Sequence, residues 1–136
     1  MAADIRKVTP QFSVAPQIEA ADVEAAKAQG FVKLINNRPD SEVPGQPTSA
    51  EMEAAARAAG LGYVHIPFVG RPSPEQAEAV AREAEAAEGP VLAFCRSGTR
   101  SITAWSMGQA MSGRRTRQEL VELAAGAGYD LSAVLG

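Results

Sequence analysis

The chain is poor in the residues that build disulfide frameworks and metal sites. Its 136 residues include one cysteine and one histidine. A single cysteine excludes a disulfide within the chain, and one cysteine with one histidine cannot make a zinc site alone. Neither a metal nor another cofactor is therefore expected.

Basic charge and long apolar runs are also lacking. Lys and Arg number 13 against 16 Asp and Glu, for a formal net charge of -3. This argues against binding of nucleic acid or of an anionic membrane, both of which need a basic face. No stretch reaches membrane-spanning length, and the first residues lack the apolar core of a signal peptide. We expect one cytoplasmic domain over residues 1–136, while the oligomeric state stays unknown.

Strand and helix patterns alternate along the chain. Capping boxes open at Thr48, Ser73 and Thr116, and each precedes apolar residues at helical spacing. A further helix is expected before Gly30, and another over 101–111. Strands are expected within 4–14 and over 31–36, 62–68 and the run ending at Phe94. This predicts a layered α/β fold with a mainly parallel sheet flanked by helices, whose loops at Asn37, Val69 and Cys95 share one edge.

The most informative stretch surrounds the only cysteine. An apolar run ends at Cys95, the polar residues 96–100 follow, and a helical pattern starts at once. A thiol between a strand end and a helix N-terminus is favoured as the thiolate, and the same backbone groups bind oxyanions. A lone buried cysteine is more often structural. However, Arg96 and Arg100 in one turn repel each other and the helix dipole unless an anion neutralises them.

The run Cys-Arg-Ser-Gly-Thr-Arg-Ser at 95–101 resembles the active loops of the tyrosine-phosphatase and rhodanese classes. Over almost its whole length the chain also resembles the bacterial phosphatase-like domains named after beta-lactamase hydrolase-like proteins. The matching stretches outside the loop are 14–18, 35–40, 65–67 and 127–131. That resemblance implies a tyrosine-phosphatase-like fold, in agreement with the pattern of elements.

The resemblance also implies roles for the loop residues. Cys95 would be the nucleophile, and Arg100 would clamp two oxygens of a phosphoryl-type anion. Amides from Arg96 to Ser101, including those of Ser97, Gly98 and Thr99, would cradle the anion. Ser101 would also donate a hydrogen bond to the thiolate. The expected partner is a small anionic or phosphorylated molecule.

The departures from the phosphatase pattern leave the reaction open. Four residues separate Cys95 from Arg100, whereas tyrosine phosphatases have five, and four is the rhodanese arrangement. A phosphatase is favoured because the fold resemblance covers more of the chain. Sulfane-sulfur transfer through a persulfide on Cys95 is the alternative, and a silent oxyanion-binding module is a third.

A general acid is missing from its usual place, because residues 68–73 contain no carboxylate. The 37–47 loop could supply one, with Asp40 the best candidate and Glu42 the next. An aspartate after proline is as often a turn residue. Arg38 could pair with Asp40 or add positive potential at the mouth of the site. His65 is more simply a supporting residue than a base.

Overall fold

The computed structural model describes residues 3–135 and contains a five-stranded sheet in the order β1-β2-β5-β3-β4. Among the described strands only the β1–β2 pair is antiparallel, and the β2–β5, β5–β3 and β3–β4 pairs are parallel. This confirms the expected mixed, mainly parallel α/β architecture. The strands are β1 (Arg6–Thr9), β2 (Phe12–Ala15), β3 (Lys33–Asn36), β4 (Gly62–His65) and β5 (Val91–Phe94).

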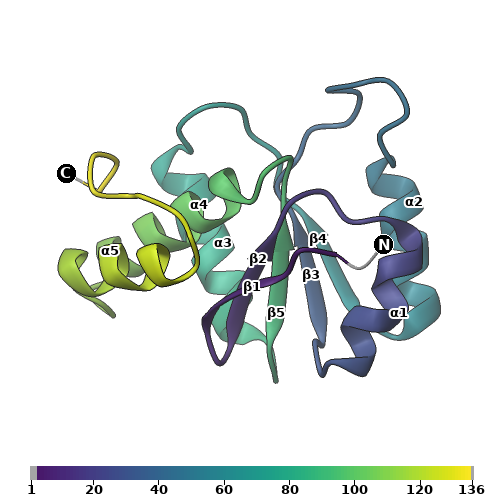
Figure 1. Cartoon of the computed structure of the whole chain (residues 1–136), viewed down its shortest axis with the longest axis horizontal. Coiled ribbons are helices and arrows are strands. Elements are labelled where there is room, and N and C mark those ends of the chain that lie inside the picture. The colour runs from purple at the N-terminus through teal and green to yellow at the C-terminus, as the bar shows by residue number, and fades with distance from the viewer. Residues whose placement is uncertain (1–2, 136) are drawn as a thin grey trace.

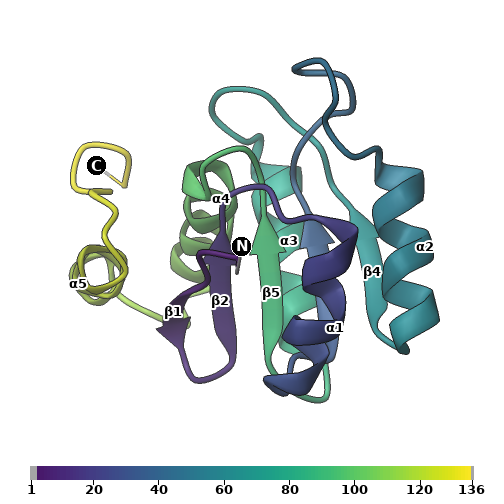
Figure 2. The ribbon, with the colours of Figure 1, turned by 45° about the vertical axis from the view of Figure 1, so that its right-hand side comes forward.

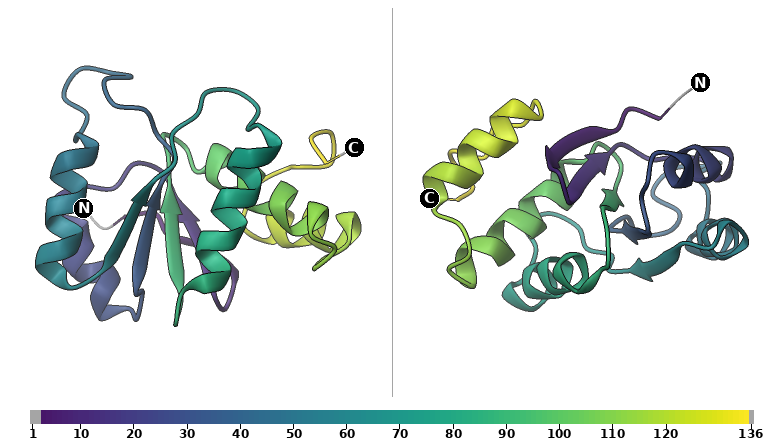
Figure 3. Two further views of the ribbon diagram at one scale, coloured as in Figure 1. Left: turned by 180° about the vertical axis from the view of Figure 1, so that it is seen from behind. Right: turned by 90° about the horizontal axis from the view of Figure 1, so that it is seen from below.

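Helices cover both faces of the sheet. Figure 1 shows α1 and α2 on one side and α3, α4 and α5 on the other, and Figure 2 separates the two groups. Seen from behind and from below, the sheet lies between these layers, with α5 outermost (Figure 3). The helices are α1 (Ala20–Ala28), α2 (Ser49–Ala59), α3 (Pro74–Ala86), α4 (Thr99–Met111) and α5 (Arg117–Gly126). No helix among the described residues is long and apolar enough to cross a membrane.

The central strand β5 fixes the position of the site. All four of its residues are buried, and they alternate between two apolar clusters. Leu92 and Phe94 face the layer of α1 and α2, whereas Val91 and Ala93 face the layer of α3, α4 and α5. Such two-sided burial is what a parallel strand inside a sheet requires. The chain therefore leaves β5 at Cys95 from the middle of the sheet.

Local signals set the helix ends well and the strand ends less well. Thr48, Ser73 and Thr116 all form the expected capping boxes. The strands at 31–36 and 62–68 are shorter than expected, because pairing is confined to 33–36 and 62–65. Helix α4 starts at Thr99 rather than at Ser101, after Gly98 as N-cap. Arg100 consequently lies in the first turn of α4.

Helix α4 packs very closely on α3 at Gly108. A Cβ atom at this position would lie 2.5 Å from the Ala77 carbonyl oxygen and 2.5 Å from the Ala81 Cβ. No such neighbour exists at Gly126, the last residue of α5, where a Cβ would meet nothing within 4 Å. The close approach of α3 and α4 therefore depends on a glycine at 108.

We expect Gly108→Ala to lower the free energy of unfolding by roughly 1–3 kcal/mol, the usual cost of overpacking. The overlap outweighs the gain of about 1 kcal/mol in helix propensity. Gly126→Ala, which has the propensity gain without the overlap, should instead raise stability by up to about 1 kcal/mol. Urea unfolding of both variants measures the difference. Equal stability of Gly108→Ala and wild type would contradict the packing account.

Candidate functional site

Cys95 lies at the carboxyl end of β5, where its amide donates to the Ala15 carbonyl at 3.4 Å. The residue is fully buried, yet it belongs to neither apolar cluster of the core. Its Sγ accepts a hydrogen bond of 3.1 Å from the amide of Gly98. The thiol is therefore turned toward the backbone of its own loop.

The turn from β5 to α4 surrounds this sulfur. Gly98 has a φ of 90°, a conformation that favours glycine, and serves as the N-cap of α4. The first amides of a helix have no acceptor within it, and they carry the positive end of its dipole. Ser97 Oγ donates to Thr99 Oγ1 at 3.0 Å and accepts from the Thr99 amide at 3.4 Å. Residues 95–98 thus form a short turn into α4, with the Gly98 amide donating to the sulfur.

Arg100 is held by a two-point ion pair with Glu42. Nη1 and Nη2 each donate to one Glu42 carboxylate oxygen at 2.8 Å, and Nη1 also donates to the Phe68 carbonyl at 3.1 Å. Of the five N–H donors of a guanidinium, these bonds leave Nε–H and one N–H of Nη2. Those two donors form the side-on face that can grip two oxygens of an anion. The Glu42 carboxylate therefore holds Arg100 while two N–H donors of the guanidinium stay available for an anion.

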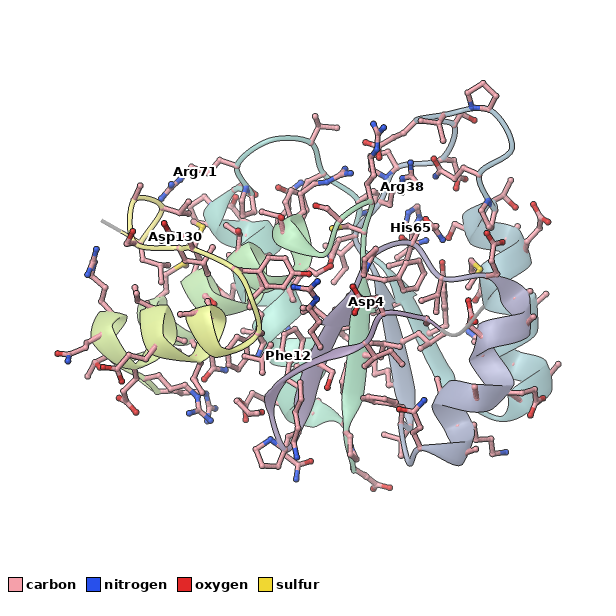
Figure 4. The ribbon with its side chains drawn as sticks, viewed as in Figure 1. Asp4, Phe12, Arg38, His65, Arg71 and Asp130 are labelled. Carbon is pink, nitrogen blue, oxygen red and sulfur yellow. The ribbon has the colours of Figure 1, made fainter. Side chains whose placement is uncertain are left out.

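Arg38 is a second arginine that donates to the Glu42 carboxylate. Its Nε donates to Glu42 at 2.8 Å, and its Nη1 donates to Gln17 Oε1 at 3.1 Å. The side chain is only 4% exposed, and the loop that carries it rises above the carboxyl ends of the strands (Figure 4). His65 lies beside this loop and bonds through Nε2 to the Arg38 carbonyl at 2.8 Å. His65 therefore supports the loop, as expected.

Two arginines on one carboxylate determine the charge of Glu42. Hydrogen bonds from Arg100 first, and from Arg38, lower the pKa of Glu42 to about 2, against the opposing effect of burial. Glu42 is thus ionised near neutral pH and has no proton to give. The expectation that Glu42 could replace Asp40 as general acid is corrected: Glu42 is a positioning residue for the two arginines.

Asp40 contacts the start of α2 rather than Arg38, with which it was expected to pair. Its Oδ1 accepts a hydrogen bond of 2.7 Å from the amide of Ser49, the first residue of α2. Arg38 pairs with Glu42 rather than with Asp40. A role of Asp40 as general acid stays a prediction, and it would require the carboxylate to leave the Ser49 amide.

Hydrogen bonds to Glu42 raise the pKa of Arg100, while burial opposes them. A negative charge at Cys95 would raise the pKa of Arg100 further. The arginine therefore lies within electrostatic reach of the sulfur as well as of the carboxylate. Arg96, by contrast, is an exposed residue of the same loop, whose carbonyl accepts from the Gln17 amide at 3.4 Å.

Two buried polar atoms near the sulfur are without hydrogen-bond partners among the described residues. One is Ser101 Oγ, and the other is Asn37 Oδ1. Asn37 follows β3 and donates its amide to the Phe94 carbonyl at 2.9 Å, which places it next to Cys95 across the sheet. Buried polar groups are usually satisfied. Ser101 Oγ forms no hydrogen bond to the Cys95 sulfur in this structure, so its expected bond to the thiolate stays a prediction.

Arg100 borders a surface hollow that is mostly apolar. Its lining comes from the loop after β4, from α4 and from the C-terminal segment, namely Gly70, Arg71, Thr99, Arg100, Thr103 and Val134. Arg71 points toward the C-terminal segment and donates to the Val134 carbonyl at 3.2 Å (Figure 4). A larger hollow lies around the β1–β2 turn and Gly89, away from Cys95 and without a nucleophile. Cys95 lines neither hollow, and Arg100 and Thr99 connect the hollow beside the C-terminal segment with the 95–101 stretch.

The sequence profile of the "Beta-lactamase hydrolase-like protein, phosphatase-like domain" family matches residues 4–112. The chain belongs to this family. A beta-lactamase hydrolase-like protein of Agrobacterium fabrum is 39% identical over 129 residues, which is 93% of this chain and 30% of that protein. This phosphatase-like domain thus spans less than a third of the length of that curated relative.

Solved structures agree with the family and with the fold. A putative phosphatase from Neisseria meningitidis is 32% identical, with a TM-score of 0.85 over 97% of this chain and 94% of that one. Tk-PTP in its active form is 21% identical, with a TM-score of 0.71 over 92% and 85% of the two chains. TpbA of P. aeruginosa in complex with pTyr is 17% identical, with a TM-score of 0.66 over 98% and 75%. The phosphatase-like domain therefore has a tyrosine-phosphatase-like fold.

Sequence reasoning missed several contributors to the site of this phosphatase-like domain. Gln17 and the Phe68 carbonyl position the two arginines, and Tyr129 donates to the Ser97 carbonyl at 2.9 Å. Gln17 and Tyr129 both lie in stretches that resemble the family, which was the only signal available. A backbone carbonyl such as that of Phe68 leaves no signal in a sequence.

We expect Glu42→Gln to lower the free energy of unfolding by roughly 2–3 kcal/mol at neutral pH. Breaking a buried ion pair costs about 3–5 kcal/mol, and the value is reduced here because the Glu42 side chain is 20% exposed. The folded-state pKa of Glu42 lies below its ordinary 4.5, so its contribution is present above 4.5 and lost as pH falls toward about 2.

Urea unfolding at several pH values checks this expectation. The difference between wild type and Glu42→Gln should shrink as the pH falls through that window. Glu53→Gln is the matched control, because Glu53 forms an exposed pair with Arg57, and it should change stability by at most about 0.5 kcal/mol. A Glu42→Gln variant as stable as this control would show that the two-arginine network contributes little.

Proposed function

We propose that this domain hydrolyses a phosphomonoester through a phosphocysteine intermediate on Cys95. The observation that carries the proposal is the convergence of three groups in one loop. The Cys95 sulfur accepts a hydrogen bond from the Gly98 amide, and α4 begins at the next residue. The hydrogen bonds of Arg100 to Glu42 and Phe68 leave its Nε–H and one N–H of Nη2 for an anion. Family membership and the tyrosine-phosphatase-like fold support the same reading.

The reaction follows from these positions. The Cys95 thiolate attacks phosphorus, an S–P bond forms, and the bond from phosphorus to the leaving oxygen breaks. Loop amides and the Arg100 fork stabilise the charge that develops on the equatorial oxygens. Water then attacks phosphorus, the S–P bond breaks, and inorganic phosphate and the thiolate are released. The Ser101 hydroxyl donates to the sulfur as it leaves.

The leaving oxygen needs a proton or must tolerate negative charge. Glu42 cannot supply the proton near neutral pH, because its pKa is about 2. Asp40 is the remaining candidate. Its carboxylate would first have to give up the hydrogen bond from the Ser49 amide and then move to the leaving oxygen of the substrate. A phenolic leaving group needs less help than an alkoxide, since a phenol ionises at a pKa of about 10. Substrates with acidic leaving groups should therefore react fastest.

Burial of Cys95 sets a condition on this mechanism. The residue has no exposed surface, so side chains above the sulfur must give way before a phosphorus atom can reach it. The hollow beside Arg100 would take the organic part of the substrate. A phosphorylated molecule as substrate is also supported by TpbA, which was solved in complex with pTyr.

One observation favours a second reaction, sulfane-sulfur transfer. Four residues separate Cys95 from Arg100, and a loop of this length suits the smaller persulfide. A catalytically silent oxyanion-binding module is the third possibility, favoured by the full burial of Cys95. These readings differ in what becomes attached to the sulfur: a phosphoryl group, one sulfur atom or nothing.

We expect the wild-type domain to hydrolyse p-nitrophenyl phosphate between pH 5 and 8, and Cys95→Ser to abolish turnover. Arg100→Lys should reduce kcat roughly 100-fold or more, because a point charge cannot replace a two-oxygen grip. Arg82→Lys is the matched control, since Arg82 is an exposed residue of α3 paired with Glu78. It should leave turnover unchanged.

Mass spectrometry separates the three readings. A phosphoryl adduct on Cys95 after acid quenching supports the phosphatase. A gain of one sulfur after thiosulfate, without hydrolysis of p-nitrophenyl phosphate, would replace it with the sulfurtransferase. If neither adduct forms and phosphate still protects Cys95 from alkylation, the loop binds anions without catalysis.

A further inference from the structure

Tyr129 lies outside residues 4–112, where the family profile matches, yet it touches the loop around Cys95. Its hydroxyl donates to the Ser97 carbonyl at 2.9 Å. The contact is close: a Cβ atom at Gly98 would lie 2.2 Å from the Tyr129 hydroxyl oxygen. The hydroxyl end of Tyr129 therefore lies directly against Gly98.

The Ser97 carbonyl and the Gly98 amide belong to one planar peptide group. Tyr129 donates a hydrogen bond to the oxygen of this peptide group. The N–H of the same group, which belongs to Gly98, donates to Cys95 Sγ at 3.1 Å. A hydrogen bond accepted by a peptide oxygen polarises the group and strengthens the bond that its N–H donates. The tyrosine hydroxyl is thus connected to the sulfur through a single peptide plane.

We propose that Tyr129 is a positioning residue that fixes the Ser97–Gly98 peptide and, through it, stabilises the Cys95 thiolate. This inference rests on the proposed function only in taking the thiolate as the reactive form. Through Tyr129, the segment after α5 would contribute to the site at Cys95.

The surroundings of Tyr129 hold it as a hydrogen-bond donor. Burial first, and then the charges of Cys95 and Asp4, raise the pKa of Tyr129, while Arg6 opposes them. The hydroxyl therefore keeps its proton at neutral pH. The Arg6 guanidinium lies 5.5 Å from the ring centroid and is fixed by bonds to the Ala127 carbonyl and to Asp4.

Glycine at 128 makes room for this support. Its φ is 92°, and a Cβ atom there would lie 2.3 Å from Arg6 Nη1. Strand β1, which carries Arg6, and the segment after α5 thus meet at the ring of Tyr129. Arg100, which pairs with Glu42, is a further charged group within electrostatic reach of the sulfur, and the exposed Arg96 belongs to the same loop.

The test is the pH dependence of Cys95 alkylation by iodoacetamide, followed by mass spectrometry. In Tyr129→Phe the midpoint of the profile should move to higher pH by on the order of half a unit, because the polarising bond is lost. Tyr63→Phe is the matched control. The Tyr63 hydroxyl bonds to Asn36 and Ser49 and not to the 95–101 loop, so the loss of this hydroxyl should leave the profile at the wild-type midpoint.

Each other outcome decides against the proposal. An unchanged midpoint in a folded Tyr129→Phe variant would mean that water replaces the hydroxyl without loss. Equal shifts in both variants would indicate a general loosening of the fold. Thermal unfolding of both variants, and exchange of the Gly98 amide proton, which should become faster only in Tyr129→Phe, keep the two cases apart.

The outcome is also separable from that of the proposed function. If wild type fails to hydrolyse p-nitrophenyl phosphate but the alkylation midpoint moves in Tyr129→Phe, the phosphatase proposal fails and the role of Tyr129 stands. If wild type hydrolyses the ester, Tyr129→Phe should lower kcat several-fold below the shifted midpoint. KM should stay within about twofold, because the Arg100 fork is intact.

Discussion

The hydrogen bond from the Gly98 amide to the Cys95 sulfur is the contact on which the site depends. It ties a fully buried thiol to the backbone of its own loop. It exists because Gly98 adopts a positive φ, which lets α4 begin at the next residue. The same turn brings Arg100 into the first helical turn. One glycine conformation thus sets the sulfur, the helix N-terminus and the arginine in a single loop.

Charge balance explains how two arginines coexist around this loop. Arg38 and Arg100 share the Glu42 carboxylate, which their hydrogen bonds keep ionised. This arrangement uses three donors of Arg100 and leaves two on its side-on face. Glu42 therefore holds the guanidinium in place without filling the position that an incoming anion would take. The network gives Glu42, the second candidate for a general acid after Asp40, a positioning role for the two arginines.

Much of the fold followed from local signals, whereas the site network did not. Capping boxes such as that at Thr48 and the apolar run before Cys95 predicted the helices and the sheet. Strand ends were less clear, because pairing partners rather than propensity end them. Arg100 lies 58 positions from its partner Glu42, and Tyr129 lies 32 positions from its partner Ser97. Contacts at such separations depend on tertiary packing, and spacing in one sequence cannot reveal them.

In the function that we propose, the 95–101 loop is an anion cradle closed by Arg100 over a reactive sulfur. The most direct measurement is the rate of Cys95 labelling by iodoacetamide at neutral pH, with inorganic phosphate or with chloride at equal ionic strength. The account predicts faster labelling than for an ordinary peptide thiol, and clear slowing by phosphate alone. Labelling no faster than that of a peptide thiol, and indifferent to phosphate, would contradict it.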